Sequence, residues 1–216
     1  MQEIIKFISR EVPSKILLIL FVYKDGKVGD KFLGPLTMTK LLYPNNPLFA
    51  GSVIENINKL EEFGIIYSKR ERIKNRNRRI LFINFKKFVE IFDYYYNLGL
   101  TEEEKEILAK WFSEVDWKFL IDGCFEEIIR GELNKSIIKI IGDLIKSSLL
   151  VADLFKINKY ETNEKNDYID FNNKLLALPN PIIEKLNKIK FSSPLLEKPI
   201  LLIVIPIYII LQQKIK

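Results

Sequence analysis

The chain has 216 residues, 48% of them hydrophobic, which is enough apolar material for one large packed domain or two small ones. It contains no histidine and a single cysteine; histidine-based triads, zinc sites with Cys and His ligands and intramolecular disulfides are therefore excluded, and we expect no enzyme, cofactor or metal site. The formal net charge of +6 is uneven, because residues 1–88 carry 17 Lys and Arg against 8 Asp and Glu, whereas residues 89–216 carry 17 against 20.

The N-terminal segment has the apolar spacing of two helices, a short amphipathic one at residues 4–8 and a more buried one at 16–23. Residues 31–36 are predicted to form a brief strand. Thr37 is predicted to cap the N-terminus of a short helix that ends before Pro44. The first residues lack the long apolar core of a signal peptide, so we expect a cytoplasmic protein.

A third helix is predicted from Ala50 to Phe63. It buries apolar side chains spaced four and three residues apart, and Gly64 ends it. Its opposite face carries side chains that could reach bases and phosphates, although a glutamate among them disfavours close approach to phosphate. These candidate contacts are Ser52, Glu55, Asn56 and Lys59.

Two strands follow at residues 65–70 and 79–85, with a polar, Asn-rich segment between them that suits the tip of a hairpin. Five of the seven arginines of the chain fall between residues 70 and 79. Arginine binds phosphates and enters narrow DNA minor grooves, so this hairpin is the main candidate for contact with DNA. The alternative is a solvated hairpin whose charges prevent aggregation of an edge strand. The candidate side chains are Lys69, Arg70, Arg72, Lys74, Arg76, Arg78 and Arg79.

The order helix, strand, helix, helix, basic hairpin resembles the winged helix-turn-helix domain. Residues 52–66 are similar to the recognition helix and first wing strand of MarR- and ArsR-type transcriptional regulators. In both, a small hydroxyl residue opens the helix, here Ser52, and the helix ends in a Leu-Glu-Glu pattern followed by Gly and two apolar residues, here Leu60 to Ile66. The resemblance covers residues 1–88 and implies a domain that holds duplex DNA through its wing and recognition helix. The connection at residues 43–49 is longer than is usual in the family.

The second half has the periodicity of helices only. Predicted helices cover residues 86–97, 117–129, 136–155, 168–178 and 181–189, and a capping box at Thr101–Glu104 opens a further one. Residues 158–167 are polar and without periodicity, which indicates a loop. We therefore predict a mainly α protein with a small β-hairpin: a winged helix at residues 1–88 and an all-helical domain at 89–216 for dimerisation or partner binding.

The C-terminal segment 195–211 is apolar apart from Glu197 and Lys198, with thirteen uncharged residues from Pro199 to Leu211. As a helix those thirteen residues would be only about 20 Å long, too short to cross the roughly 30 Å of bilayer hydrocarbon comfortably. The apolar surface of this segment must be buried against its own domain, against a second copy of the chain, or in lipid. A homodimer is expected, since winged-helix regulators bind two half-sites, and membrane contact through 195–211 is the remaining alternative.

Together these features predict a DNA-binding protein that acts as a transcriptional regulator. The same parts would serve a plasmid or viral replication or partition protein, and the sequence does not separate these roles. The alternative from another class is a protein-interaction module that uses a winged helix.

Overall fold

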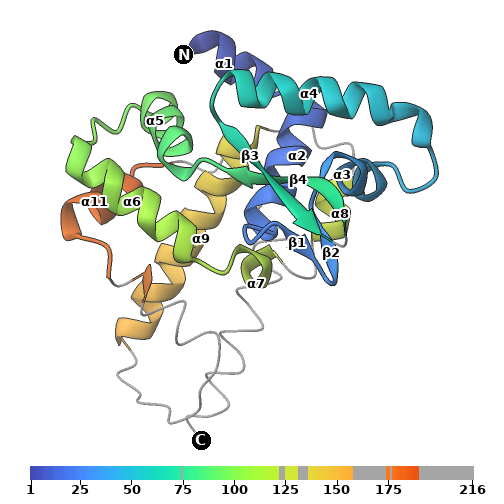
Figure 1. The fold of residues 1–216 in the computed structure, drawn as a ribbon. Coiled ribbons are helices and arrows are strands. Elements are labelled where there is room, and N and C mark those ends of the chain that lie inside the picture. The colour runs from blue at the N-terminus through green and yellow to red at the C-terminus, as the bar shows by residue number, and fades with distance from the viewer. Residues whose placement is uncertain (74, 122–124, 131–135, 158–173, 176, 190–216) are drawn as a thin grey trace, which may run out of the picture.

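The fold is known from a computed structural model that describes residues 1–73, 75–121, 125–130, 136–157, 174–175 and 177–189. It is mainly helical and contains two small antiparallel hairpins (Figure 1). The predicted fold class is therefore confirmed. The predicted loop 158–167 and the apolar tail 195–211 lie outside the described residues, as does most of the predicted helix 168–178.

The N-terminal half is built around helix α2 (Glu11–Val22), which is apolar around nearly its whole circumference and buried from Ile16 to Val22. Helices α1 (Gln2–Ile8), α3 (Pro35–Leu42) and α4 (Ala50–Glu62) pack against it. Helix α4 buries Val53, Ile57 and Leu60, the three residues that its spacing predicts. Gly64 follows with φ +70°, in the left-handed region that glycine adopts without strain.

The two hairpins are β1 (Lys27–Val28) with β2 (Lys31–Phe32), and β3 (Ile66–Ile73) with β4 (Arg76–Ile83). A hydrogen bond from the Leu81 N–H to the Leu33 carbonyl, 2.9 Å long, joins the first hairpin to β4. Gly34 lies directly against the Arg79 carbonyl, where a Cβ atom would collide with backbone. Glycine at position 34 therefore permits the close approach of the two hairpins.

The predicted cap at Thr37 is wrong. Helix α3 begins two residues earlier, at Pro35, after Gly34 in an extended conformation. Proline is favoured at the first helical position because its ring sets φ and its missing N–H is not needed there. The Thr37 hydroxyl instead donates to the Phe32 carbonyl, at 2.9 Å, and ties α3 to β2.

The second half continues with α5 (Phe85–Tyr96) and α6 (Glu102–Glu114), which pack against each other. Asn84 caps α5, and the predicted capping box of α6 is present, with reciprocal bonds between Thr101 and Glu104. The remaining described helices are α7 (Trp117–Ile121), α8 (Phe125–Arg130), α9 (Ile137–Ile157) and α11 (Asn180–Leu186). Within the described residues, no helix is both long and apolar enough to cross a bilayer.

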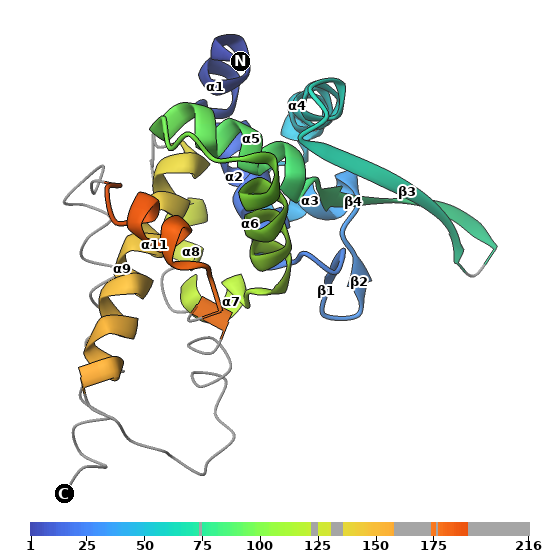
Figure 2. The same ribbon diagram turned by 90° about the vertical axis from the view of Figure 1, so that its left-hand side faces the viewer.

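One hydrophobic core joins the two predicted domains, whose boundary at residue 88 falls inside α5. Phe21 of α2 packs edge-on against Phe88 of α5, with ring centroids 4.7 Å apart, and against Trp117 of α7 at 5.4 Å. Helix α2 also contacts α9. The hairpin β3–β4 stands out from this body, and α4 lies beside its base (Figure 2).

Candidate nucleic-acid interface

The hairpin β3–β4 projects because only the inner ends of its strands are buried against the rest of the fold. Ile66 pairs with Ile83 at the buried end, and Ile73 pairs with Arg76 at the tip. Asn75 adopts φ 61° in the connection, a left-handed conformation that asparagine tolerates and that suits tight hairpin turns. Lys74 lies outside the described residues. The basic segment therefore forms the outer half of the hairpin, as the sequence predicts.

Directly paired residues point to the same face of a hairpin, and successive residues alternate between faces. The register therefore divides the basic side chains into two groups. The first group lies on the face turned toward helix α4, which we call the α4 face. The second group lies on the face that packs against Gly26 through Phe82, which we call the aromatic face. The α4 face carries Arg70, Arg72 and Arg79, and the aromatic face carries Lys69, Arg76 and Arg78.

Arg79 does not point into solvent as a free cation. Its guanidinium pairs with the Glu61 carboxylate and donates to Asn58 Oδ1 at 3.2 Å, and both partners lie on α4. Its Nε donates to Ser68 Oγ across the hairpin, at 3.4 Å. The sequence predicts that Arg79 contacts DNA, but in the structure its side chain joins the hairpin β3–β4 to α4.

Sequence reasoning missed the two partners of Arg79. The signal was its position next to the apolar run 80–83, which places it nearest the body of all the arginines in the hairpin. Asn58 and Glu61 are 21 and 18 residues distant along the chain, so no local pattern connects them to Arg79.

The other four arginines of the hairpin are exposed, and none makes an ion pair or side-chain hydrogen bond with any part of the chain that the structure describes. The four are Arg70, Arg72, Arg76 and Arg78. Glu71 pairs in register with Arg78 and is also exposed. Since a guanidinium without an internal partner keeps all its donors for a ligand, these four side chains are the best candidates for phosphate contacts.

The predicted contacts on α4 are less available. Ser52 and Glu55 are exposed, but the Asn56 amide donates to the Ser52 carbonyl at 2.7 Å. Lys59 pairs with Glu62 at 3.0 Å, and its ammonium also lies 4.6 Å from the centre of the Phe63 ring. The helix carries three glutamates and one lysine, so the positive charge of the interface belongs to the hairpin.

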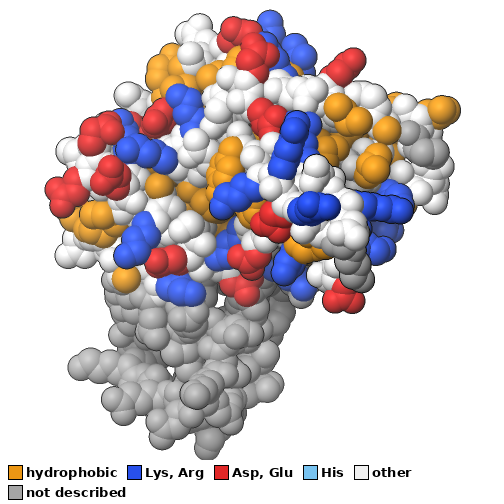
Figure 3. Space-filling model, viewed as in Figure 1, with side chains coloured by type: hydrophobic (Ala, Val, Ile, Leu, Met, Phe, Trp, Pro, Cys, Tyr) orange, Lys and Arg blue, Asp and Glu red, His pale blue; other side chains and the backbone are white. Residues whose placement is uncertain are grey.

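Figure 3, which looks along the projecting hairpin, shows lysine and arginine side chains gathered around it. Lys27 and Lys31 of the first hairpin and Lys40 of α3 are also exposed. Lys31 and Lys40 line a shallow depression together with Leu36. These lysines form no cluster in the sequence, because they are scattered along the chain and only the fold brings them near the hairpin β3–β4.

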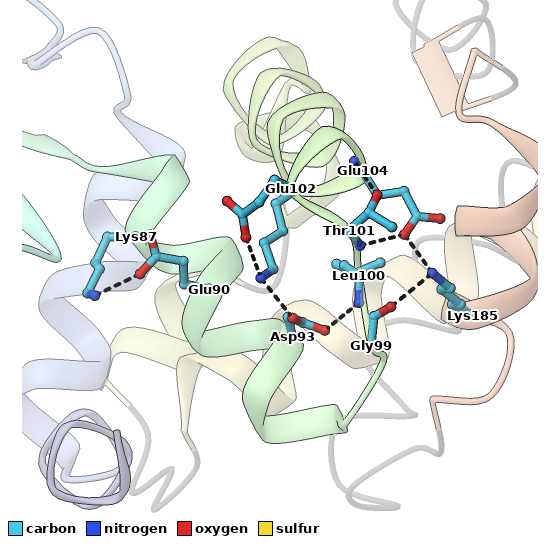
Figure 4. A network of polar contacts seen from close by, with 10 residues as sticks. Lys87, Glu90, Asp93, Gly99, Leu100, Thr101, Glu102, Glu104 and Lys185 are labelled. Carbon is cyan, nitrogen blue, oxygen red and sulfur yellow. Dashed lines mark hydrogen bonds and ion pairs between the residues drawn. The ribbon is translucent and has the colours of Figure 1, made fainter.

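A second polar network lies far from the hairpin and connects helices (Figure 4). Lys105 bridges Asp93 of α5 and Glu102 of its own helix, at 3.5 and 2.9 Å. Lys185 of α11 pairs with Glu104 at 2.6 Å and donates to the Gly99 carbonyl at 3.2 Å. Every labelled charge is paired with another, so we assign this network to the packing of α5, α6 and α11.

No group of three acidic or cysteine side chains within the described residues could hold a metal ion. Comparison with known proteins finds no matching family model, no matching curated protein and no matching solved structure.

Proposed function

We propose that this protein binds double-stranded DNA through the hairpin β3–β4, with helix α4 beside it in the adjacent groove, and acts as a non-enzymatic transcriptional regulator. The observation that carries the proposal is the group of four exposed arginines without internal partners on a projecting hairpin. Protection of an edge strand does not require arginine or a group of four such cations, whereas a run of phosphates is matched by several.

The arrangement of elements supports the same function. Helices α2, α3 and α4 are followed by a two-stranded hairpin, and Leu33 bonds to the inner strand β4, which is the order of a winged helix. In such a domain the wing and the third helix contact neighbouring parts of one duplex. We include a cytoplasmic homodimer in the proposal, because two wings related by two-fold symmetry would contact two half-sites.

The two faces of the hairpin allow a matched test. The variants R70A/R72A and R76A/R78A each lose two positive charges, from the α4 face and the aromatic face respectively. If the wing and α4 hold one duplex together, the first variant should weaken binding more than the second. K110A/K118A, which removes two exposed lysines of the second half, should bind duplex as the parent does.

Affinity is measured by fluorescence anisotropy on a labelled duplex at several salt concentrations. The parent should lose affinity steeply with salt, and the quadruple variant R70A/R72A/R76A/R78A should flatten the slope by up to about one unit for each lost phosphate contact. Equal binding and equal slope in the parent and the quadruple variant would disprove the proposal.

A protein-interaction module is the second candidate function. It is favoured by exposed apolar side chains at the connection between α3 and α4, where Leu48 is 90% and Phe49 is 44% exposed. The titration above separates the two functions, since a protein-binding module has no reason to show a steep salt dependence with duplex DNA. A role in plasmid or viral replication or partition uses the same DNA contacts and stays an alternative within the first proposal.

A further inference from the structure

The aromatic face of the wing carries a feature that phosphate contacts do not require. Tyr67 on β3 and Phe82 on β4 are paired in register and stack across the hairpin, with ring centroids 5.5 Å apart and ring planes 20° apart. Tyr67 is 43% exposed. A tyrosine this exposed on a well-formed strand offers a large flat apolar surface to solvent.

Tyr67 lies on the outer strand of the hairpin. Strand β4 has neighbours on both sides, β3 on one and Leu33 on the other, whereas β3 is an edge strand within the described residues. Phe82 is held from below by Gly26, where a Cβ atom would lie 2.8 Å from the phenylalanine ring. Phe82 is thus the inner ring of the stacked pair, and Tyr67 is the outer, more exposed ring.

Cations surround this stack. The Lys69 ammonium lies 5.4 Å from the centre of the Phe82 ring and 5.9 Å from that of Tyr67. Arg76 and Arg78 continue along the same face toward the tip, and both are exposed. Glu71 lies on this face as well, opposite Arg78, so three cations face one carboxylate there. An aromatic pair followed by an excess of cations matches a nucleic-acid strand with unpaired bases, because the bases stack on the rings while the phosphates meet the cations.

We propose that the aromatic face of the wing binds an unpaired nucleobase on Tyr67, so that the preferred ligand is duplex DNA with a single-stranded extension. This inference deepens the proposed function and rests on it. The α4 face then holds the duplex, and Arg76, Arg78 and Lys69 hold the phosphates of the extension.

The test compares one labelled duplex in two forms, blunt and with a six-nucleotide single-stranded extension, bound by the full-length protein and its variants. The parent should prefer the extended form. Tyr67→Ala should weaken binding of the extended form by about five- to hundredfold, the range for loss of one base–aromatic stack, and leave blunt-duplex binding unchanged. Tyr67→Phe should keep the preference, because it keeps the ring. R76A/R78A should reduce the preference more than R70A/R72A does.

Two results would overturn this inference and leave the proposed function standing. One is equal affinity of the parent for both forms of the duplex, and the other is a preference for the extended form that survives in Tyr67→Ala. Unchanged blunt-duplex binding by Tyr67→Ala also shows that the variant is folded. If the parent fails to bind the blunt duplex, the proposed function fails instead. The stacking site is then tested on the single strand alone, where loss of binding in Tyr67→Ala supports it and equal binding refutes it.

Discussion

Arg72 and Arg79 have the same side chain on the same face of one hairpin, but their surroundings are opposite. Arg72 is exposed near the tip, whereas the Arg79 guanidinium is held by Glu61, Asn58 and Ser68. Within the described residues, the second carboxylate oxygen of Glu61 is buried and accepts no hydrogen bond. The partly buried charge of Glu61 therefore depends on the ion pair with Arg79 to offset the cost of its lost hydration.

We expect Arg79→Ala to lower the free energy of unfolding by about 1–3 kcal/mol, because it leaves a half-buried carboxylate without its partner. Arg72→Ala should change it by less than about 0.5 kcal/mol, as is usual for an exposed side chain. Urea denaturation followed by circular dichroism measures both. Equal stability of the two variants would show that the clamp between β4 and α4 contributes nothing.

At the scale of elements, helix α6 is held at its N-terminus by its own capping box and by α11. The Glu104 carboxylate accepts from the Thr101 N–H at 2.8 Å and pairs with Lys185. The Lys185 ammonium, and after it the Thr101 backbone N–H, lower the pKa of the Glu104 carboxyl from its ordinary value of 4.5. A carboxyl with a lowered pKa in the folded state stabilises the fold when it is ionised.

This contribution is complete above the ordinary pKa of Glu104, and it is lost as the pH falls through the lowered value. The urea midpoint of the parent should therefore fall between pH 5 and pH 3 more steeply than that of Glu104→Gln. Glu103→Gln is the matched control, since Glu103 is an exposed neighbour in the same helical turn with no partner among the described residues. Parallel pH profiles for the parent and Glu104→Gln would contradict the assignment.

At the scale of the whole molecule, Phe21 connects the N-terminal half, which carries the hairpin β3–β4, to the helical half. Besides Phe88 and Trp117, its ring contacts Phe85 at 5.4 Å and Phe112 at 6.3 Å between centroids. Phe21 itself lies on α2, before residue 88, and Phe112 and Trp117 lie on helices after it. We therefore expect the described part of the molecule to unfold as one cooperative unit.

Phe21→Ala should lower the free energy of unfolding by about 3–5 kcal/mol, the usual cost of removing a buried phenylalanine. Phe49→Ala is the control, because Phe49 is exposed and stacks only on Tyr43 among the described aromatic rings. Hydrogen exchange should show that the amides of α4 and of α6 lose protection together in Phe21→Ala. Protection lost in α6 but kept in α4 would mean that the halves unfold separately.

Local sequence patterns were sufficient to predict most of the described helices and strands. Apolar spacing and Gly64 located α4, and the Thr101–Glu104 pattern located the start of α6. Alternation located the inner parts of the hairpin strands β3 and β4, but the polar residues 71–73 and 76–78, predicted as the connection, continue these strands. These features depend on residues within a few positions of each other, and the backbone periods of helix and strand convert such spacing into faces. The hairpin and its basic tip were predictable for the same reason.

The tertiary structure alone decided which cations are free and which parts share a core. Arg79 differs from its neighbours through partners 18 and 21 residues away, and Phe21 meets helices much later in the chain. The division of the arginines between two faces required the strand register, and the place of Tyr67 on an edge strand of the described sheet required the strand order. Such contacts arise when distant segments pack, and a one-dimensional pattern contains no information on which distant segments will meet.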